Sequence, residues 1–598
     1  MASLDDNELA LKLFKRADKL KSYRNSYFDP RWQEISDYFW PDVSDINTEK
    51  TESTTGWFDR LYESTAMRAS ATCSVGVRNW VTPSTEPWLD LAPPTNLTKN
   101  AMARQPDMSQ PGSARVQKLL NPQSQPVDEN GVDEATRWSA DTAQTILQEL
   151  AASNFYSVVQ PFNRSACVFG TALMFMEEGK ANLYRFEQFK VGTFVICEND
   201  EKTIDTVVRW FKLTIRQAAQ KFGIENLPKK MQEAFDKKKY DEMYEFMHHV
   251  FPNDDFKVGE LGTNGKAFAS VYQTVVEKKI VSYQGYDEMP YFCLRWSRWG
   301  TDDQAYGCSP AFETLVEARQ LNFVTQYQDA LAELKAFPRL LYPDNLDGNI
   351  QLAAGGVTTY KADQPEAVPR EWLTQGDYQN TKEMLDDKRD ALKKAFFVDI
   401  FNALGNLEDK RMTATEVSQR IGEKLDQFTG TFDQYRTDLI NPLVLRCIGI
   451  AYRANKLGKA PEALMVRPNN DPKEPMQLAT PKINIKSRVT LAMNEVKNVG
   501  TEKTLGMLQP LAQMRPEIMD NFNFDNLVRM TGRNFGMPEA SFRSMKEVVD
   551  LRNQRAQMIA KENALKNAET AANAAGKLGK APQQLQDAAS NQLQSAQG

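Results

Sequence analysis

The chain has 598 residues, of which 41% are apolar; this is enough for about three to five domain-sized units with real cores and excludes an intrinsically disordered protein. Its 73 basic and 79 acidic residues give a formal net charge of -6, which argues against a protein that coats nucleic acid through its overall charge. The most hydrophobic run, residues 166–176, is shorter than the roughly 18 residues of a transmembrane helix, and the N-terminal residues lack the basic start of a signal peptide. We therefore expect neither a membrane span nor a secretory signal.

The first part of the chain is mainly helical in pattern and carries one insertion. Residues 5–80 have helical periodicity, and residues 86–94 resemble a strand. Residues 97–133 are rich in Pro, Gln, Ser and Asn, so we expect a mobile surface insertion there. The helical period returns at residue 134, and a second helix is expected to end near Gly170.

A set of strands follows, and with the helices it predicts an α+β fold that is mainly helical. Thr214 and Gln217 form a Thr-x-x-Gln capping box at the start of a short helix, which Gly223 closes. Short segments rich in β-branched and aromatic residues predict strands. These segments are residues 171–177, 181–188, 192–198, 206–213, 268–277, 279–286 and 291–299.

The cysteines are scattered along the chain and form no Cys-x-x-Cys pair. Most have apolar neighbours, so we interpret them as reduced core residues in a cytoplasmic setting. They are Cys73, Cys167, Cys197, Cys293, Cys308 and Cys447.

The second half opens with a long helix. Ser309 is expected to cap this helix, with Pro310 at its first position. Residues 337–376 are rich in turns and predict a small strand module, from which a helix at residues 377–397 returns. The polar stretch at residues 402–410 then predicts a soft loop.

A long capped helix is expected after this loop. Thr413 and Glu416 form a Thr-x-x-Glu capping box, and Pro442 is expected to end or kink the helix. From residue 413 to residue 440 it would span about 40 Å. Its apolar stripe consists of Val417, Ile421, Leu425, Phe428, Phe432, Tyr435 and Leu439.

The C-terminal part contains further helix and little strand. A lone strand is expected near residues 482–491, and helices continue to about residue 570. Residues 571–598 are rich in Ala, Gln and Asn and contain no aromatic residue, so we expect a flexible tail.

No motif in the sequence carries a convincing catalytic chemistry. Ser309 lies in a Gly-Cys-Ser-Pro-Ala stretch, but a nucleophilic serine of this type needs a histidine that follows it. The chain's two histidines, His248 and His249, precede it, and adjacent histidines do not form a His-x-x-x-His metal site. The Gly-Lys pair ending at Lys266 lacks the Walker spacing. We predict no catalytic residue, no bound metal and no cofactor.

Two interpretations of other residues stay open. Acidic pairs at residues 254–255, 302–303 and 386–387 could act as acid and base in a soluble hydrolase, although their spacing does not indicate it. Strand aromatics more often build cores than stack on nucleic-acid bases. The aromatics in question are Trp210, Phe211, Trp296 and Trp299.

Several stretches resemble the portal, or head-to-tail connector, proteins of short-tailed, podovirus-type bacteriophages with double-stranded DNA. The stretches fall in one order across most of the chain, and together they are more specific than any one alone. The insertion at residues 97–133 and the tail after about residue 570 have no counterpart in the resemblance. The matching stretches are residues 60–91, 154–178, 205–223, 306–322, 412–425 and 524–557.

The resemblance implies a portal architecture with wing, stem, clip and crown. It also implies a closed ring of identical subunits, usually twelve, at one capsid vertex, with the genome passing through the axis of the ring. On this chain the implied regions are a wing at residues 1–305, a stem at 306–336 and 377–397, a clip at 337–376, a tunnel loop at 398–412, a long wing helix and returning strand at 413–493, a crown at 494–570 and a flexible tail at 571–598.

The resemblance also implies where partners touch the chain. The tunnel loop would face DNA, and few basic residues there suit a sliding duplex, because each phosphate contact adds affinity and drag. The candidate residues are Asn402, Asn406, Lys410 and Arg411 in the tunnel loop, Arg339, Tyr342, Asp344, Asn345 and Asp347 in the clip, and the structural helix caps Ser309, Thr413 and Glu416.

The implied partners are the major capsid protein, a scaffolding protein, the terminase large subunit, tail adaptor and nozzle proteins, and the DNA in the channel, without a membrane. The implied location is the head-tail junction of the virion, and the host cytoplasm during assembly. The chain would not be an enzyme, because the ATPase of the packaging motor would be a separate partner. Another ring-forming head-tail adaptor, or a soluble hydrolase with an unrecognised carboxylate site, remain as alternatives.

Overall fold

The computed structural model describes most of the chain. The described residues are 6–41, 46, 61–94, 129–257, 259–300, 304–336, 340–341, 370–371, 378–405, 428–466, 477–486, 504–507, 510, 515, 522–534, 537, 541–543 and 545–578.

The fold is α+β and mainly helical, as expected. The helices are α1 (Asp6–Tyr27), α2 (Asp29–Phe39), α3 (Thr65–Val81), α6 (Glu129–Ala152), α7 (Phe155–Phe169), α8 (Ile215–Phe222), α9 (Lys229–Asp236), α10 (Pro310–Glu313), α11 (Leu315–Ala336), α12 (Tyr378–Ala395), α13 (Val398–Gly405), α15 (Asn441–Arg453), α17 (Phe524–Asn534) and α18 (Met545–Leu578).

Most strands are short. They are β1 (Leu89–Ala92), β2 (Thr171–Glu178), β3 (Tyr184–Phe189), β4 (Phe194–Glu198), β5 (Ile204–Thr214), β6 (Met243–Pro252), β7 (Phe268–Thr274), β8 (Ile280–Tyr286), β9 (Tyr291–Arg295), β10 (Ser297–Arg298), β11 (Gly307–Cys308), β12 (Leu340–Leu341), β13 (Arg370–Glu371), β14 (Met465–Val466), β15 (Gln477–Leu478) and β16 (Lys482–Ile485).

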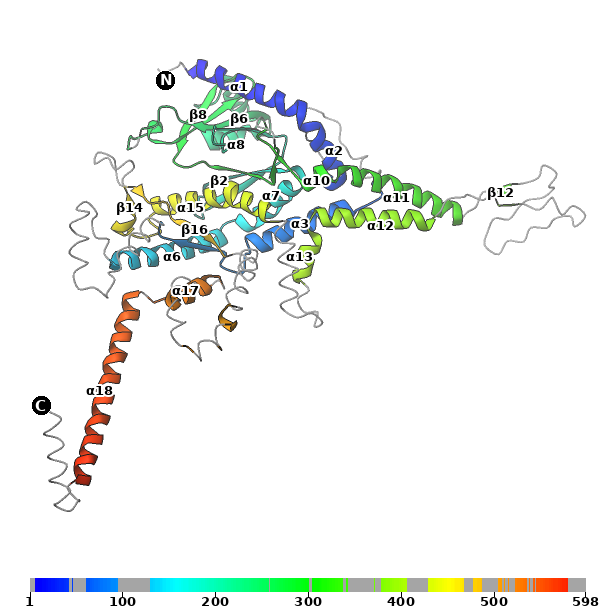
Figure 1. Cartoon of the computed structure of the whole chain (residues 1–598). Coiled ribbons are helices and arrows are strands. Elements are labelled where there is room, and N and C mark those ends of the chain that lie inside the picture. The colour runs from blue at the N-terminus through cyan, green and yellow to red at the C-terminus, as the bar shows by residue number, and fades with distance from the viewer. Residues whose placement is uncertain are drawn as a thin grey trace, which may run out of the picture.

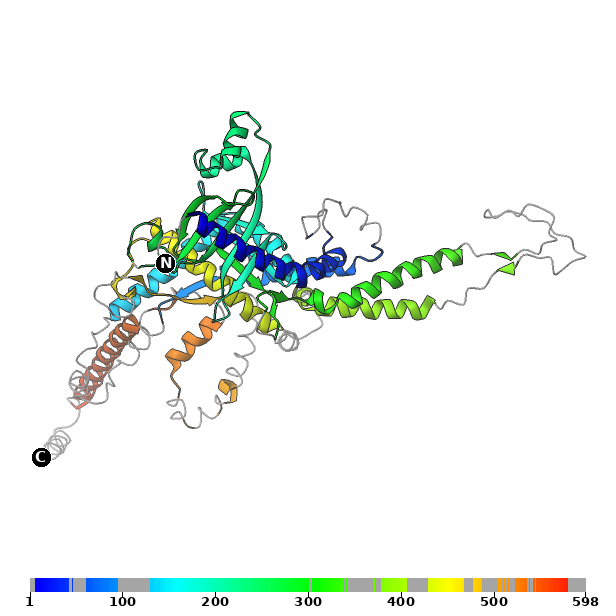
Figure 2. The ribbon, with the colours of Figure 1, turned by 90° about the horizontal axis from the view of Figure 1, so that it is seen from above.

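The molecule has a layered body from which two helices project. In Figure 1, a sheet with α1 across it lies above a helical layer that includes α7, α15, α6 and α3. Helices α11 and α12 leave this body side by side, and Figure 2 shows the same pair projecting when seen from above. Among the described helices, none is long and apolar enough to cross a membrane.

The larger sheet has the antiparallel order β4-β5-β6-β7-β8 and is covered on both faces. Because side chains alternate along a strand, Val208 and Met247 face α1 and pack against Ala17. On the opposite face, Phe246 and Tyr272 pack against helices α8 and α9. The sheet is therefore the middle layer of a three-layer unit.

Several local predictions in this region are confirmed. The Gln217 amide N–H donates to Thr214 Oγ1 at 3.3 Å, and the Thr214 N–H donates to Gln217 Oε1 at 3.0 Å, so the capping box is complete. Gly223 ends that helix with a φ of +82°. The long strand β6, which contains His248 and His249, was not predicted.

The smaller sheet, of order β3-β2-β9, forms the main core with α7, α3 and α2. Helix α7 ends at Gly170, as predicted, and the structure places this glycine in the left-handed region with a φ of +72°. A Cβ on Gly170 would lie 2.4 Å from the Gly307 carbonyl oxygen, so the close approach of β11 requires a glycine there. The Trp32 indole N–H donates to the Phe169 carbonyl at 3.0 Å and fixes α2 on the same core.

Other expectations are corrected by the structure. The strand expected to be alone, β16, pairs with β1, so that Leu89 lies opposite Ile485. Helix α6 begins at Glu129, inside the expected insertion, and α18 continues to Leu578, inside the expected tail. The stem helix is interrupted at Thr314, between α10 and α11.

The helix before Pro442 does not end at this proline. Residues 428–435 are helical, Arg436–Ile440 form a π-helical turn, and α15 then holds Pro442 in its first turn. A proline is tolerated in a first turn, where its missing N–H is not needed. Residues 413–427, which include the expected caps Thr413 and Glu416, lie outside the described residues.

The π-helical turn takes part in a buried charge network. Arg295 on β9 donates through Nε and Nη2 to both carboxylate oxygens of Asp438, at 2.9 and 3.0 Å, and also contacts Glu198. The Arg295 side chain is 2% exposed and that of Asp438 is 7% exposed. Arg298 also contacts Glu198, at 2.9 Å, but its side chain is 39% exposed.

We expect Asp438→Ala to lower the free energy of unfolding by about 3 kcal/mol, because it leaves a buried guanidinium short of a partner. Urea unfolding followed by tryptophan fluorescence measures the change. Arg298→Ala is the matched control, since it removes an exposed partner from the same network and should cost at most about 1 kcal/mol. Equal losses in the two variants would contradict the role given to Asp438.

Candidate functional site

Ser309 is a structural residue in this fold. It occupies the N-cap position of α10 with Pro310 next to it, as predicted, but its hydroxyl does not cap the helix. The hydroxyl instead donates to the Val168 carbonyl at 2.7 Å and fastens the start of the stem to the end of α7. Since this hydroxyl is buried and donates its hydrogen bond to a carbonyl, it does not act as a nucleophile.

The two histidines lie in strand β6 and face opposite sides of the sheet. His248 is hydrogen-bonded to the Tyr291 hydroxyl at 2.6 Å and to Ser270 Oγ at 2.9 Å, and its ring stacks on Tyr272. His249 is buried on the side of α1, and its Nε2 has no hydrogen-bond partner. Among the described residues, no group of three or more His, Cys, Asp or Glu side chains could hold a metal.

Lys266 and Asp386, two other polar candidates, form ion pairs within the fold. Lys266 forms an ion pair with Asp287 at 2.7 Å, and Asp386 pairs with Arg389 at 3.1 Å. The six cysteines are free thiols, and four of them are buried. The acidic pair at residues 302–303 lies outside the described residues.

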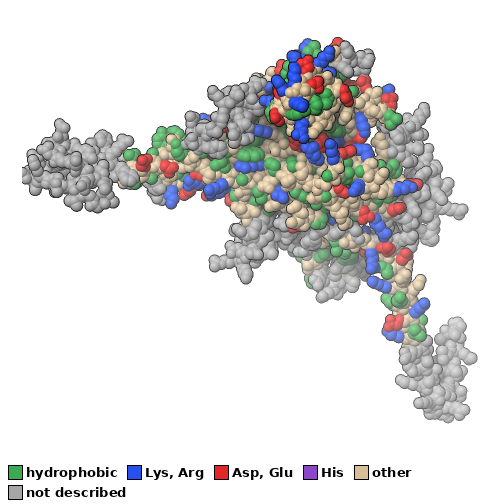
Figure 3. Space-filling model, turned by 180° about the vertical axis from the view of Figure 1, so that it is seen from behind, with side chains coloured by type: hydrophobic (Ala, Val, Ile, Leu, Met, Phe, Trp, Pro, Cys, Tyr) green, Lys and Arg blue, Asp and Glu red, His purple; other side chains and the backbone are tan. Residues whose placement is uncertain are grey.

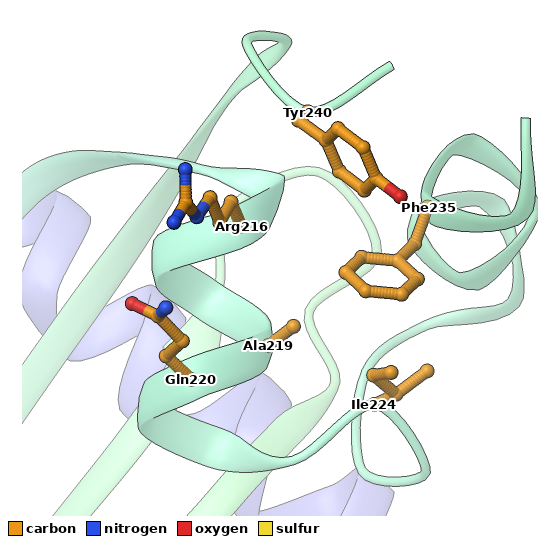
Figure 4. A pocket seen from close by; sticks show the side chains of 6 residues that line it. All are labelled: Arg216, Ala219, Gln220, Ile224, Phe235 and Tyr240. Carbon is orange, nitrogen blue, oxygen red and sulfur yellow. The ribbon is translucent and has the colours of Figure 1, made fainter. Parts of the chain in front are cut away.

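A pocket lies between α8 and α9. Its volume is about 470 Å³, and Figure 4 shows Phe235 and Tyr240 on one side, opposite the helix that carries Arg216 and Gln220. The side chains that line it include no carboxylate, thiol or imidazole, so it offers no acid-base pair. Its lining residues are Arg216, Ala219, Gln220, Ile224, Phe235 and Tyr240.

The feature that stands out is the projecting pair of α11 and α12, here called the stem. Leu385 and Leu392 of α12 are fully buried at a seven-residue spacing, and Leu321 of α11 is buried with them. The Lys388 ammonium also donates to Gln320 Oε1 at 2.6 Å across the pair. The two helices therefore hold each other with one apolar seam and a polar contact.

Glu63 fixes the base of the stem to the body. One of its oxygens accepts hydrogen bonds from the Thr65 N–H and hydroxyl at the start of α3, and the other accepts two from the Arg389 guanidinium, at 2.6 and 3.1 Å. Burial alone would raise the pKa of the Glu63 carboxyl, but the hydrogen bonds from Arg389 and Thr65 outweigh it, so this pKa lies below its usual range. On α11, the Asn322 side chain accepts from the Tyr62 N–H at 2.8 Å.

One face of α11 exposes large apolar side chains. Val316, Phe323 and Tyr327 are 57%, 58% and 55% exposed, and spacings of seven and four residues place them on one side of the helix. We call these three residues the stem stripe. Val316 and Phe323 also line a groove of about 850 Å³ that reaches Tyr62. Figure 3 shows hydrophobic, basic and acidic side chains side by side on the stem.

The structure describes only part of the two sites expected from the resemblance. Residues 398–405 form helix α13 instead of the expected loop, and Asn402 is exposed on this helix. In the clip region the structure describes only the pairing of β12 with β13. Outside the described residues lie Asn406, Lys410, Arg411, Arg339, Tyr342, Asp344, Asn345 and Asp347.

Comparisons with known proteins agree with one another. The family model described as bacteriophage head to tail connecting protein matches residues 10–542. The portal protein of Salmonella phage epsilon15 is 23% identical over 573 residues, with 94% of each chain covered. The probable portal protein of Bordetella phage BPP-1 is 23% identical over 582 residues, with 96% of each chain covered.

We expect Arg389→Ala to loosen the base of the stem. The variant leaves the half-buried Glu63 carboxylate without its main partner, which should cost about 1 to 2 kcal/mol once solvent exposure is considered. Hydrogen exchange of the amides at residues 61–65 measures the opening. Lys393→Ala is the control, because the Lys393–Asp390 pair is exposed and adds little. Unchanged exchange in Arg389→Ala would contradict the proposed anchor.

We also expect stability to fall in mild acid. Burial lowers the pKa of His248 and brings the pKa of His249 to about 4, so both rings stay neutral in the fold. In the unfolded chain an imidazole has a pKa of about 6.5, so the unfolded state takes up more protons as pH falls below this value. His249 should then cost up to about 1.4 kcal/mol per pH unit between pH 6.5 and 4, and the lowered pKa of His248 acts in the same direction.

The measurement for this expectation is the urea midpoint as a function of pH for the wild type and His249→Leu. The variant should lose less stability between pH 7 and pH 5, because one buried imidazole no longer titrates. Curves with the same slope would show that His249 does not contribute.

Proposed function

The chain belongs to the family of bacteriophage head to tail connecting proteins, and from this premise we propose that it is a portal subunit whose copies close into a ring at one capsid vertex. The observation that carries the proposal is the family match over residues 10–542. The names of the relatives, both portal proteins, favour this role over another ring-forming adaptor. Double-stranded DNA would pass through the axis of the ring during packaging and ejection.

The stem stripe supports ring assembly. Exposed apolar patches on soluble proteins commonly mark interaction surfaces, and the side chains of the stripe are all more than half exposed on α11. A ring needs two different complementary surfaces on each subunit, and the stripe and its groove would serve as one of them. A subunit count of twelve is proposed from the resemblance alone.

The region names follow from the same proposal. Helices α11 and α12 would be the stem, the segment between them the clip, and the body the wing, with α17 and α18 in the crown. The clip would dock the terminase large subunit during packaging, and the tail adaptor and nozzle proteins later. The wing and crown would face the major capsid protein and the scaffolding protein. The ring would sit at the head-tail junction of the virion after assembly in the host cytoplasm.

The channel residues remain a proposal as well. Asn402 would lie at the root of the segment that approaches the DNA, followed by Asn406, Lys410 and Arg411. A lining with few basic groups would allow sliding, since neutralised phosphates add affinity that opposes movement. The family is structural, and the energy for packaging would come from a separate ATPase.

We expect the purified chain to form closed rings of about a dozen copies with an axial hole. Native mass spectrometry and negative-stain images of one sample test this. Phe323→Asp should shift the sample toward monomers, because losing the burial of a phenyl ring, about 2 to 3 kcal/mol, weakens each contact by about a hundredfold.

The control is Tyr283→Asp, which changes an exposed aromatic residue on β8 and should leave the rings intact. Intact rings in Phe323→Asp would remove the stem stripe from the contact. A wild-type chain that stays monomeric at high concentration, and binds neither capsid nor tail proteins, would overturn the portal proposal.

A further inference from the structure

The junction between stem helix α12 and helix α13 is made by a residue in an unusual backbone conformation. Phe397 has a φ of +56°, in the left-handed region that bulky L-residues rarely adopt. The other described non-glycine residues with positive φ are three lysines and an asparagine, and asparagine in particular tolerates this region. A phenylalanine at such a position is a backbone outlier that the surrounding structure has to hold.

The backbone at this junction changes direction within one residue. The Phe397 N–H donates to the Lys394 carbonyl at 3.0 Å and closes the end of α12. The Phe397 carbonyl in turn accepts from the Ile400 N–H and the Phe401 N–H, both at 3.1 Å, and so begins α13. Figure 1 shows α13 turning away from the direction of α12.

Aromatic rings hold the junction in place. The Phe397 ring lies 5.6 Å from the Phe428 ring and 6.3 Å from the Trp296 ring, measured between centroids. The neighbouring Phe396 is fully buried against Phe39, at 5.5 Å. A glycine would adopt the same φ without strain, but it would offer no ring for these contacts.

Helix α13 is seated at a second point, four residues further on. The Phe401 ring lies against Gly76 of α3 so closely that a Cβ on Gly76 would come within 2.3 Å of the ring. Trp80 of the same helix meets the Phe401 ring edge-on at 5.5 Å, and Phe428 lies 6.0 Å away. Two contacts on one short helix fix both its position and its direction.

We propose that Phe397 is a positioning residue of the channel: its left-handed backbone, locked by Trp296 and Phe428, sets the direction in which α13 leaves the stem and carries Asn402. The strained backbone of Phe397 is retained because its packed ring makes the joint rigid, whereas a glycine would leave the joint free to bend. A movement of the stem is then passed on to α13 and is not absorbed at the junction. The channel role of α13 rests on the portal function proposed above, whereas the rigid joint does not.

The joint itself is tested by a distance measurement on the full chain. Spin labels on Asp387→Cys in α12 and Asn402→Cys in α13, both exposed positions, report the angle between the helices. The half-exposed thiols Cys197 and Cys308 are first replaced by serine. Wild-type Phe397 should give one narrow distance distribution.

Two substitutions separate backbone from ring. Phe397→Gly keeps the left-handed conformation accessible but removes the ring, and since Asn402 lies about 7 Å along the helix from the joint, the distribution should widen by about 5 Å. Phe397→Val should shift the distance, because a β-branched residue does not accept this φ. Asn455→Gly is the matched control, as it relieves a positive φ of 55° at the end of α15, and it should change nothing. Unchanged distributions in both Phe397 variants would overturn the rigid joint.

The channel role is tested by DNA retention in filled particles that carry the variant rings. Phe397→Gly rings with wild-type mass should retain less DNA, whereas Asn455→Gly rings should retain the wild-type amount. A widened distance distribution with unchanged retention would overturn the positioning role and leave Phe397 as a structural residue. If wild-type rings carry no DNA at all, the proposed function fails and the distance result still stands. If Phe397→Gly rings do not assemble, the retention test uses Gly76→Ala instead. This variant adds a methyl group that pushes against Phe401 from outside the joint.

Discussion

A helix pair that projects from a protein depends on how its base is held. The stem buries one seam between α11 and α12, and its contacts with the body include the pairs Arg389–Glu63 and Asn322–Tyr62. Its orientation is therefore decided at one end, where Glu63 joins Arg389 to the start of α3, Phe396 packs against Phe39, and the Phe397 ring meets Trp296. These contacts combine a partly buried ion pair with aromatic packing, and both resist bending.

The same base also collects chain segments that are far apart in the sequence. Phe401 and Phe428 lie within one aromatic cluster, and ten residues after Phe428 the carboxylate of Asp438 is bound by the buried Arg295. Since Arg295 lies on β9, one step along the chain from Trp296, the sheet, the π-helical turn and the stem meet at one place. Because these elements meet at one place, force on the stem would reach the body through several contacts at once.

Local features of the fold could be predicted from the sequence, whereas long-range ones could not. The capping box at Thr214 and the end of α7 at Gly170 depend on neighbours within a few residues, so the local sequence was enough to predict both. The pairing of β1 with β16 joins opposite parts of the chain, and no residue in either strand specifies its partner. Strand β6 was missed because its buried histidines interrupt an apolar pattern that only the covered sheet explains. At the candidate site, the stem helices were predicted, but Glu63 as their anchor was not.

Phe397 is the clearest case of a functional candidate without a sequence signal. A left-handed residue at a helix end is usually glycine or asparagine. Here the two adjacent residues Phe396 and Phe397 instead predict that an apolar helix face continues. The conformation of Phe397 depends on residues that are distant in the sequence. Gly76 leaves room for Phe401, and Trp296 and Phe428 pack against the Phe397 ring. Gly76 on α3 therefore lies where packing is tight, and Phe397 lies where the backbone turns, although glycine is the residue usually found at such a turn. In the portal ring proposed above, a rigid joint of this kind would keep the direction of α13 in register with the stem.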